Sequence, residues 1–260
     1  MAHYQFIIAY DGTDFQGSQR QGKKRTVQLV LEEALREIGW NERTILLAGR
    51  TDRGVHAIGQ VASCNMEWKH SETALANALN ARLPGDLAVT SARRVDDAFH
   101  ARYSAKTRTY SYRLYVSPSQ NPLAERYAWR VWPAPGLIAL QLAADLFNGD
   151  HDFIAFGSPP KKGGNTVRQV ILSRWNKEAD GLQYVISANG FLYHMVRRIV
   201  LAQVQTAMGL ITMDALASAI LNGKEIPAGM APAKGLVLSE VSYEDPQPVT
   251  FDAGEEIRTE

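Results

Sequence analysis

In this chain of 260 residues, the spacing of apolar residues predicts the same order of strands and helices twice, once in each half. In the first half, helical spacing behind the N-cap candidates Thr26 and Ser71 alternates with short apolar runs, which predicts the order β-α-β-β-α-β. The expected elements are strand 4–10, helix 27–38, strands 44–47 and 60–66, a helix around 75–79 and strand 87–95. This order is typical of the split unit of ferredoxin-like folds.

The second half follows the same order with one helix added. The expected elements are strand 108–116, helix 136–147, strands 167–175 and 182–188, helix 193–208, the added helix 213–221 and strand 236–243. We therefore expect an α+β protein of two ferredoxin-like, RRM-like halves, residues 1–104 and 105–260. No Pro/Gly-rich linker separates them, so we expect the halves to pack tightly around a central active-site cleft, a common position for binding sites.

The composition is that of a globular protein, with 45% hydrophobic and 21% charged residues. No apolar stretch approaches the ~20 residues that span a bilayer, and the chain starts in a strand without a signal-peptide pattern, so we expect no membrane contact and a cytoplasmic protein. The single cysteine, Cys64, lies in an alternating strand, which indicates a small buried side chain and not a reactive thiol.

The formal net charge of +1 hides an uneven distribution. Residues 240–260 hold seven acids and one base, so the chain before residue 240 carries 27 bases and 20 acids, a net charge of +7. A basic body with an acidic tail fits a nucleic-acid partner. We expect the tail itself to fray.

The polar turn 48–57 joins two of the predicted strands and contains one acid, Asp52. Arg50 and Arg53 flank this acid, and nearby positive charge favours the carboxylate, which is the form that acts as a nucleophile. The same pattern fits a hairpin turn whose aspartate bonds its own backbone and whose arginines are solvated. Turn chemistry alone leaves both interpretations open.

Short motifs along nearly the whole chain resemble those of the tRNA pseudouridine synthase A family, in the same order. They are residues 10–13 (YDGT) with Phe15 and Gly17, 50–57 (RTDRGVHA), 99–102 (FHAR), 106–112 (KTRTYSY), 194–198 (HMVRR) and 235–236 (GL). The set is far more specific than any one of its members. It favours a catalytic site in the polar turn.

The resemblance implies the pseudouridine synthase fold and, without a cofactor, isomerisation of uridine to pseudouridine at positions 38, 39 and 40 of the tRNA anticodon stem-loop. It makes Asp52 the nucleophile, at C1′ of the ribose or C6 of the ring, with Arg197 and Arg50 holding it ionised. It makes Tyr110 the residue that stacks on the uracil and assists proton transfer, and places Leu236 in the wall of the uracil pocket. It also implies a homodimer with one tRNA crossing both subunits.

The loop 16–25 has the side chains needed to hold phosphates and single-stranded bases. Its basic residues are Arg20, Lys23, Lys24 and Arg25. The charges could equally belong to a solvated loop. Ser18 stands where the family favours an aromatic residue, which weakens the case for stacking there and leaves the phosphate contacts untouched.

Alternation in the strand that begins near residue 106 places Arg108, Tyr110 and Tyr112 on one face, which combines charge with aromatic rings. Tyrosines on such a face either stack on bases or pack in the core. The family match favours stacking for Tyr110, whereas we expect Tyr112 in the core. Arg108 and His56 complete the expected substrate-binding residues.

Arg197 and Arg198 lie among inward-facing valines of the predicted helix 193–208, and neighbours on a helix point about 100° apart, so at most one faces the core. A buried arginine needs an anionic partner. Asp52 is the simplest candidate for this partner, and the resemblance implies that it pairs with Arg197. The rival interpretation is that both arginines contact solvent or phosphate.

The histidines lie at no metal-ligand spacing with cysteines or acids, and no phosphate-binding glycine fingerprint occurs, so we expect neither a metal site nor a nucleotide cofactor. The basic loop 161–165 could close on a bound stem or be an inert connection. Two other classes stay open. A non-catalytic RNA-binding protein would not need an acid between arginines, and a nucleoside hydrolase or glycosylase would have to admit water and release a free base.

Overall fold

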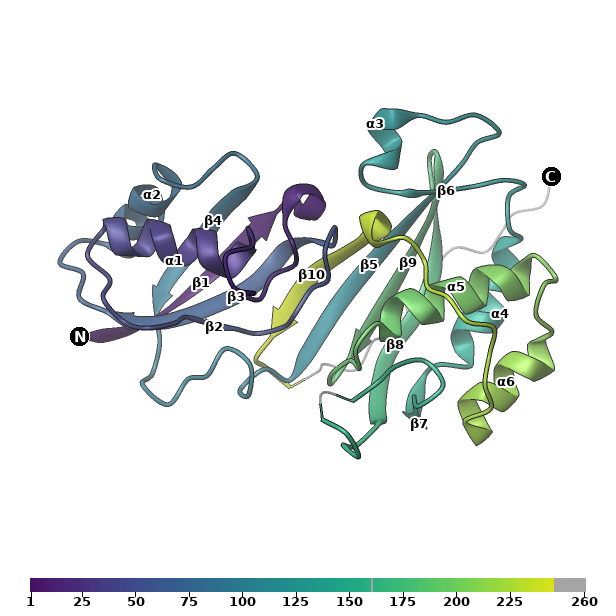
Figure 1. The fold of residues 1–260 in the computed structure, drawn as a ribbon. Helices are drawn as coiled ribbons and strands as arrows, with labels where there is room; N and C mark the ends of the chain where they lie inside the picture. Colours follow the sequence, from purple (N-terminus) through teal and green to yellow (C-terminus); the bar gives the residue numbers. More distant parts are fainter. Residues whose placement is uncertain (160, 246–260) are drawn as a thin grey trace, which may run out of the picture.

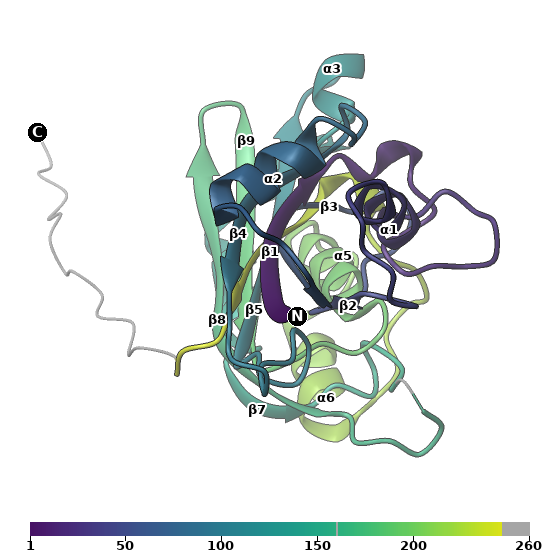
Figure 2. The same cartoon turned by 90° about the vertical axis from the view of Figure 1, so that its left-hand side faces the viewer.

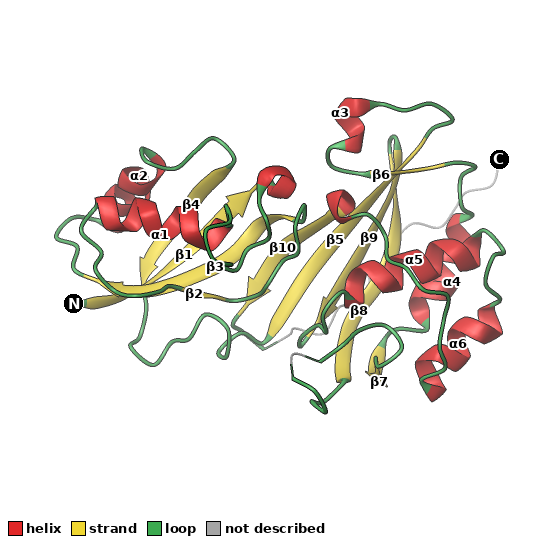
Figure 3. Cartoon of the chain, in the orientation of Figure 1, coloured by secondary structure: helices red, strands yellow, loops and turns green. Residues whose placement is uncertain are grey.

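A computed structural model describes residues 1–159 and 161–245, so most of the acidic tail that we expect to fray lies outside the described residues. Its strands form one sheet that crosses the whole molecule (Figure 1, Figure 3). In chain order they are β1 (Ala2–Tyr10), β2 (Leu46–Leu47), β3 (His56–Met66), β4 (Leu87–Arg94), β5 (Thr107–Val116), β6 (Trp129–Val131), β7 (Gly149–Asp152), β8 (Val167–Glu178), β9 (Gly181–Ala188) and β10 (Leu236–Ser242).

The strand order in the sheet is β4-β1-β3-β10-β5-β9-β8-β7, with β2 beside β3 and β6 beside β5. Pairing is antiparallel except between β3 and β10 and between β5 and β6. The helices are α1 (Val27–Glu37), α2 (Glu72–Asn80), α3 (Pro122–Glu125), α4 (Leu137–Asp145), α5 (Met195–Ala207) and α6 (Met213–Asn222), with 3-10 turns η1 (Gly12–Asp14) and η2 (Ala233–Gly235). Figure 2 shows α1, α5 and α6 on one side of the sheet.

The α+β class predicted from the sequence is confirmed. The elements of the first half follow in the expected order, and α1 and α2 begin where predicted, because the hydroxyls of Thr26 and Ser71 accept hydrogen bonds from the backbone N–H of Leu29 and Ala74. The second half keeps its expected elements and adds α3, β6 and β7. These three are short and lack the apolar periodicity from which longer elements are predicted.

The last strand of the described chain, β10, lies in the middle of the sheet, between β3 and β5. Leu238 pairs with Ala57 of β3 on one side and with Tyr110 of β5 on the other. A Cβ on Gly59 would overlap the backbone of Ser239, so the close approach of β3 and β10 requires glycine there. The two halves thus share one sheet, and their division at residues 104 and 105 stays a prediction.

The side chains expected in the core lie there. Cys64 is buried, and burial raises the pKa of its thiol to about 12, which removes the thiolate at neutral pH. Tyr112 is fully buried, and its hydroxyl donates to the carbonyl of Pro232 over 2.7 Å. The described residues include no helix with the length and hydropathy to cross a membrane.

Candidate active site

Asp52 lies in the loop between β2 and β3, and its neighbour Thr51 anchors that loop. The Thr51 N–H donates to the Ser18 hydroxyl over 2.8 Å, the Ser18 N–H donates to the Thr51 carbonyl over 3.0 Å, and the Thr51 hydroxyl lies 2.8 Å from the hydroxyl of Tyr10. Ser18, where the resemblance led us to expect an aromatic residue, is therefore a buried anchor of the loop. Gly54, with φ of +78°, completes the turn in a conformation that favours glycine.

The carboxylate of Asp52 faces the first turn of α5. Its Oδ2 accepts a hydrogen bond from Arg197 Nη1 over 3.1 Å, and His194 Nε2 lies 3.4 Å from the same oxygen. Arg197 is held in place because its Nε donates to the carbonyl of Ala231 over 2.7 Å. The Asp52 side chain is 22% exposed, and Oδ1 has no hydrogen-bond partner among the described residues. The structure thus brings together the predicted pair and leaves one carboxylate oxygen open.

The helix that carries Arg197 begins in an unusual way. His194, at the N-cap of α5, has φ of +66° and is the one residue other than glycine with positive φ in the described chain. Its backbone turns the first helical turn toward Asp52. The N-terminus of a helix carries partial positive charge, which favours a carboxylate beside it. Sequence reasoning placed His194 in a motif and gave it no role, because a left-handed φ at histidine is not legible in the sequence.

Tyr110 lies on β5 opposite Leu238 of β10, and its ring meets that of Phe191 edge-on at 5.1 Å. It is buried, and burial raises its pKa far above the ordinary value, an effect that nearby Tyr10 and the charge of Asp52 add to. The phenol is therefore protonated at neutral pH. Leu236, predicted to line the uracil pocket, is buried at the start of β10 and pairs with Tyr112, so Leu238 is the β10 residue opposite Tyr110.

A family model described as tRNA pseudouridine synthase matches residues 6–104 and 143–244. The chain belongs to this family. A tRNA pseudouridine synthase A of Thermoanaerobacter sp. (strain X514) is 36% identical over 94% of this chain and 100% of that protein. A tRNA pseudouridine synthase A 2 of Bacillus anthracis is 35% identical over 94% and 100%, and one named tRNA pseudouridine synthase A from Roseiflexus castenholzii (strain DSM 13941 / HLO8) is 39% identical over 91% and 88%. The family resemblance and the prediction of an isomerase are confirmed.

Several predicted site residues of this tRNA pseudouridine synthase lie apart from Asp52. Arg50 is exposed and forms no ion pair with Asp52 within the described residues. Arg108 is half-buried, and its guanidinium donates to four backbone carbonyls, those of Ala48, Arg102, Ala105 and Asn189. It connects the start of the Asp52 loop at Ala48, the segment before β5 at Arg102 and Ala105, and the residue after β9, Asn189. Burial lowers the pKa of Arg108. Because its guanidinium donors are already used by four carbonyls, a structural role suits Arg108 better than a contact with phosphate.

His56 lies at the far end of the same loop and is buried. Its Nδ1 accepts the Gly12 N–H over 3.0 Å and lies 3.1 Å from Oδ1 of Asp11, while burial lowers its pKa. Asp11 also bonds Arg126 and Tyr127, both 2.8 to 2.9 Å away. His56, Asp11 and Tyr127 line a pocket of about 360 Å³ whose lining does not include Asp52, Arg197 or Tyr110.

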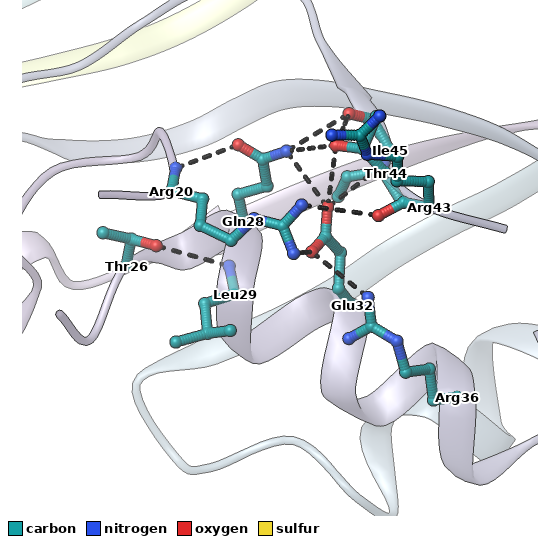
Figure 4. A network of polar contacts seen from close by, with 9 residues as sticks. All are labelled: Arg20, Thr26, Gln28, Leu29, Glu32, Arg36, Arg43, Thr44 and Ile45. Atoms are coloured by element: carbon teal, nitrogen blue, oxygen red, sulfur yellow. Dashed lines mark hydrogen bonds and ion pairs between the residues drawn. The ribbon is translucent and has the colours of Figure 1, made fainter. Parts of the chain in front are cut away.

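The basic loop divides into paired and free charges. Arg25 forms two hydrogen bonds of 2.8 Å with Asp86. Arg20 lies 2.7 Å from Oε2 of Glu32, a fully buried acid on α1 (Figure 4). Lys23 and Lys24 are exposed and have no acidic partner among the described residues, so these two are available for phosphate. Glu32 was missed from the sequence, although an acid beside Leu31 on the inward face of a helix signals a buried partner.

The remaining expectations concern metals and the second basic loop. Residues 1–159 and 161–245 contain no group of three or more His, Cys, Asp or Glu side chains placed to hold a metal ion. Residues 161–165 are exposed. Closure of this loop on RNA stays a prediction.

Proposed function

We propose that this chain isomerises uridine to pseudouridine at positions 38, 39 and 40 of the tRNA anticodon stem-loop, with Asp52 as the nucleophile. The carboxylate of Asp52 carries the proposal: one oxygen is bonded to Arg197, the other is open, and the loop beneath it is anchored through Thr51. Three relatives named tRNA pseudouridine synthase A support the choice of substrate.

The target uridine leaves its stack so that it can reach the carboxylate. Asp52 Oδ1 attacks either C1′ of the ribose or C6 of the ring. On either route the bond from C1′ to N1 breaks, the base turns and C1′ bonds to C5. The C5 proton is then lost, N1 takes up a proton and the carboxylate is released, so the product is an isomer of the substrate. No oxidant, reductant or energy source is consumed.

Arg197 keeps the charge of Asp52 in place, because a guanidinium hydrogen bond to a carboxylate is charge-assisted and directional. Tyr110 stacks on the uracil, an interaction that contributes about 1–3 kcal/mol per base. Because its pKa is raised by burial, Tyr110 assists the proton transfer at C5 as a neutral hydrogen-bonding group and does not act as a phenolate base. Leu236, Leu238 and Phe191 supply apolar surface that keeps water from a covalent intermediate.

The test is tritium release from an unmodified tRNA transcript that carries [5-³H]uridine. We expect release by the wild type and none by Asp52→Asn or Asp52→Ala, with tRNA binding retained by both variants. Tight binding without release by the wild type would favour a non-catalytic RNA-binding protein. Free uracil among the products would favour a glycosylase. Transcripts with a single uridine at 38, 39 or 40 test the positions.

We also propose a homodimer, with one tRNA crossing both subunits, in the cytoplasm where tRNA is modified. Ile7 and Ile58 support an interface, because these exposed isoleucines lie on the adjacent strands β1 and β3. Light scattering of the purified chain tests the dimer. A monomer mass at all concentrations, with and without tRNA, would contradict it.

A further inference from the structure

The backbone of His194 is the starting observation, because it is strained and lies at the proposed nucleophile. A non-glycine residue at φ of +66° costs free energy, and such residues persist where the surrounding structure holds them, often at functional sites. The N-cap side chain of α5 makes no capping hydrogen bond. The conformation therefore does not serve to begin the helix in the usual way.

The left-handed backbone instead brings the imidazole to the carboxylate. His194 Nε2 lies 3.4 Å from Asp52 Oδ2, the oxygen that already accepts from Arg197. The ring of Tyr193 lies against the imidazole with centroids 3.6 Å apart, which restricts its rotation. A distance of 3.4 Å is longer than an ordinary hydrogen bond, and hydrogen bonds at catalytic sites are often long before substrate binds and shorten afterwards.

The protonation state of His194 follows from its surroundings. Partial burial lowers its pKa and the charges of Arg197 and Arg198 add to this, whereas Asp52 acts in the opposite direction. A neutral imidazole carries one N–H donor and one acceptor nitrogen. With the proton on Nε2, the ring offers Asp52 a hydrogen bond without a second full positive charge.

We propose that His194 is a positioning residue that donates from Nε2–H to Asp52 Oδ2, so that both donors hold one oxygen and Oδ1 stays directed at the substrate. This inference rests on the proposed role of Asp52 as nucleophile. Arg197 alone fixes Oδ2 from one direction and leaves the carboxylate free to rotate about its Cβ–Cγ bond. A second donor from the preceding turn of chain removes that rotation.

The experiment uses the full chain and two substitutions at one position. His194→Gly keeps a backbone that accepts positive φ and removes the ring, whereas His194→Gln places an amide N–H at the distance of Nε2. We expect the single-turnover rate of tritium release at saturating tRNA to fall about 10- to 100-fold in His194→Gly, which is the scale of misplacing a reacting group. We expect His194→Gln to recover most of the loss, and tRNA affinity to be unchanged in both.

The outcomes separate the alternatives. An unchanged saturating rate in His194→Gly would overturn the inference, and so would weaker tRNA binding with an unchanged rate, because the ring would then contact RNA alone. A His194→Gln variant as slow as His194→Gly would also overturn it, because the donated hydrogen bond would not be what matters. Circular dichroism and a melting curve establish that each variant is folded. If the wild type itself releases no tritium, the proposed function fails, which is a different result.

Discussion

Glu32 and Asp52 are both held by arginine, and they differ in how many donors and cations surround them. Oε1 of Glu32 accepts from Gln28, Thr44 and the backbone of Ile45, and Oε2 faces two arginines, so this fully buried acid is surrounded by donors (Figure 4). Asp52 receives one hydrogen bond and is 22% exposed. Glu32 has hydrogen-bond donors at Oε1 and arginine cations near Oε2, which suits a structural role, whereas the open Oδ1 of Asp52 suits the nucleophile of the proposed function.

Glu32 and Asp52 also differ in which segments of the chain they connect. Glu32 ties α1 to the loop of Arg20 and to the segment that leads into β2, all within the first half of the chain. Asp52 reaches across 145 residues to Arg197. The contacts of Glu32 hold the segment that leads into β2, just before the Asp52 loop, and the hydrogen bond from Arg197 joins that loop to α5.

The largest expected effect comes from Asp52→Asn, which keeps the shape of the side chain and removes the proposed nucleophile. We expect the rate of tritium release to fall by about 10³-fold or more. The free energy of unfolding should stay within about 0.5 kcal/mol of the wild type, because the side chain is partly exposed and the asparagine oxygen can still accept from Arg197. Single-turnover kinetics and urea denaturation measure the two quantities. If Asp52→Asn lowered the free energy of unfolding as much as Glu32→Gln does, the two acids would not differ in their structural contribution.

Glu32→Gln should give the reverse pattern. Loss of the charge removes the ionic partner of Arg20 and Arg36, whose side chains are 34% and 41% exposed, and leaves the buried donors around residue 32 poorly matched, which costs about 1–3 kcal/mol. We expect urea denaturation to show a loss of this size, with a single-turnover rate at low temperature within about 10-fold of the wild type. Abolished chemistry in a fully stable Glu32→Gln protein would contradict a structural role for this acid.

Arg197→Lys tests the same comparison by changing the cation that bonds Asp52. Lysine keeps the charge but cannot bond Asp52 and the Ala231 carbonyl at once in the fixed geometry of a guanidinium. We expect the rate at saturating tRNA to fall about 10- to 100-fold, with little change in tRNA affinity. The matched control is Arg20→Lys, whose partner is Glu32, and for which the rate should be nearly unchanged.

The smallest effect concerns the basic loop. Lys24→Ala removes an unpaired exposed charge, so we expect tRNA affinity to weaken less than about 10-fold and the slope of log K against log salt to decrease by about 1. Arg25→Ala removes a charge that Asp86 already neutralises, so its salt slope should stay near that of the wild type. Binding titrations at several salt concentrations measure both. Equal slopes for the two variants would show that the ion pair opens when tRNA binds.

The helices and long strands of the fold could be predicted because their information is local. Apolar spacing and the N-caps Thr26 and Ser71 locate α1 and α2 within a few residues. The central position of β10 could not be predicted, because it depends on pairing between residues 181 positions apart, such as Leu238 and Ala57. The sequence of β10 itself does not indicate which strands it pairs with.

Some residues of the candidate site could likewise be predicted from the sequence, and others could not. Asp52 and Arg197 were found through family motifs and the inward face of a helix. Arg20, Arg25 and Arg108 were predicted to contact substrate, since the sequence shows charges without their partners, and the structure pairs them with Glu32, Asp86 and four backbone carbonyls. His194 depends on a backbone angle, and only the structure reveals it.

The central position of β10 also governs the order in which the molecule can be completed during synthesis. Until residues 236–242 leave the ribosome, the parts of β3 and β5 that pair with β10 are unpaired, and such edges invite pairing with other chains. The Asp52 loop leads directly into β3, so Asp52 is attached to an incomplete sheet until β10 is made. The last strand of the described chain therefore covers both of these edges, and a nascent chain stalled before it exposes them together.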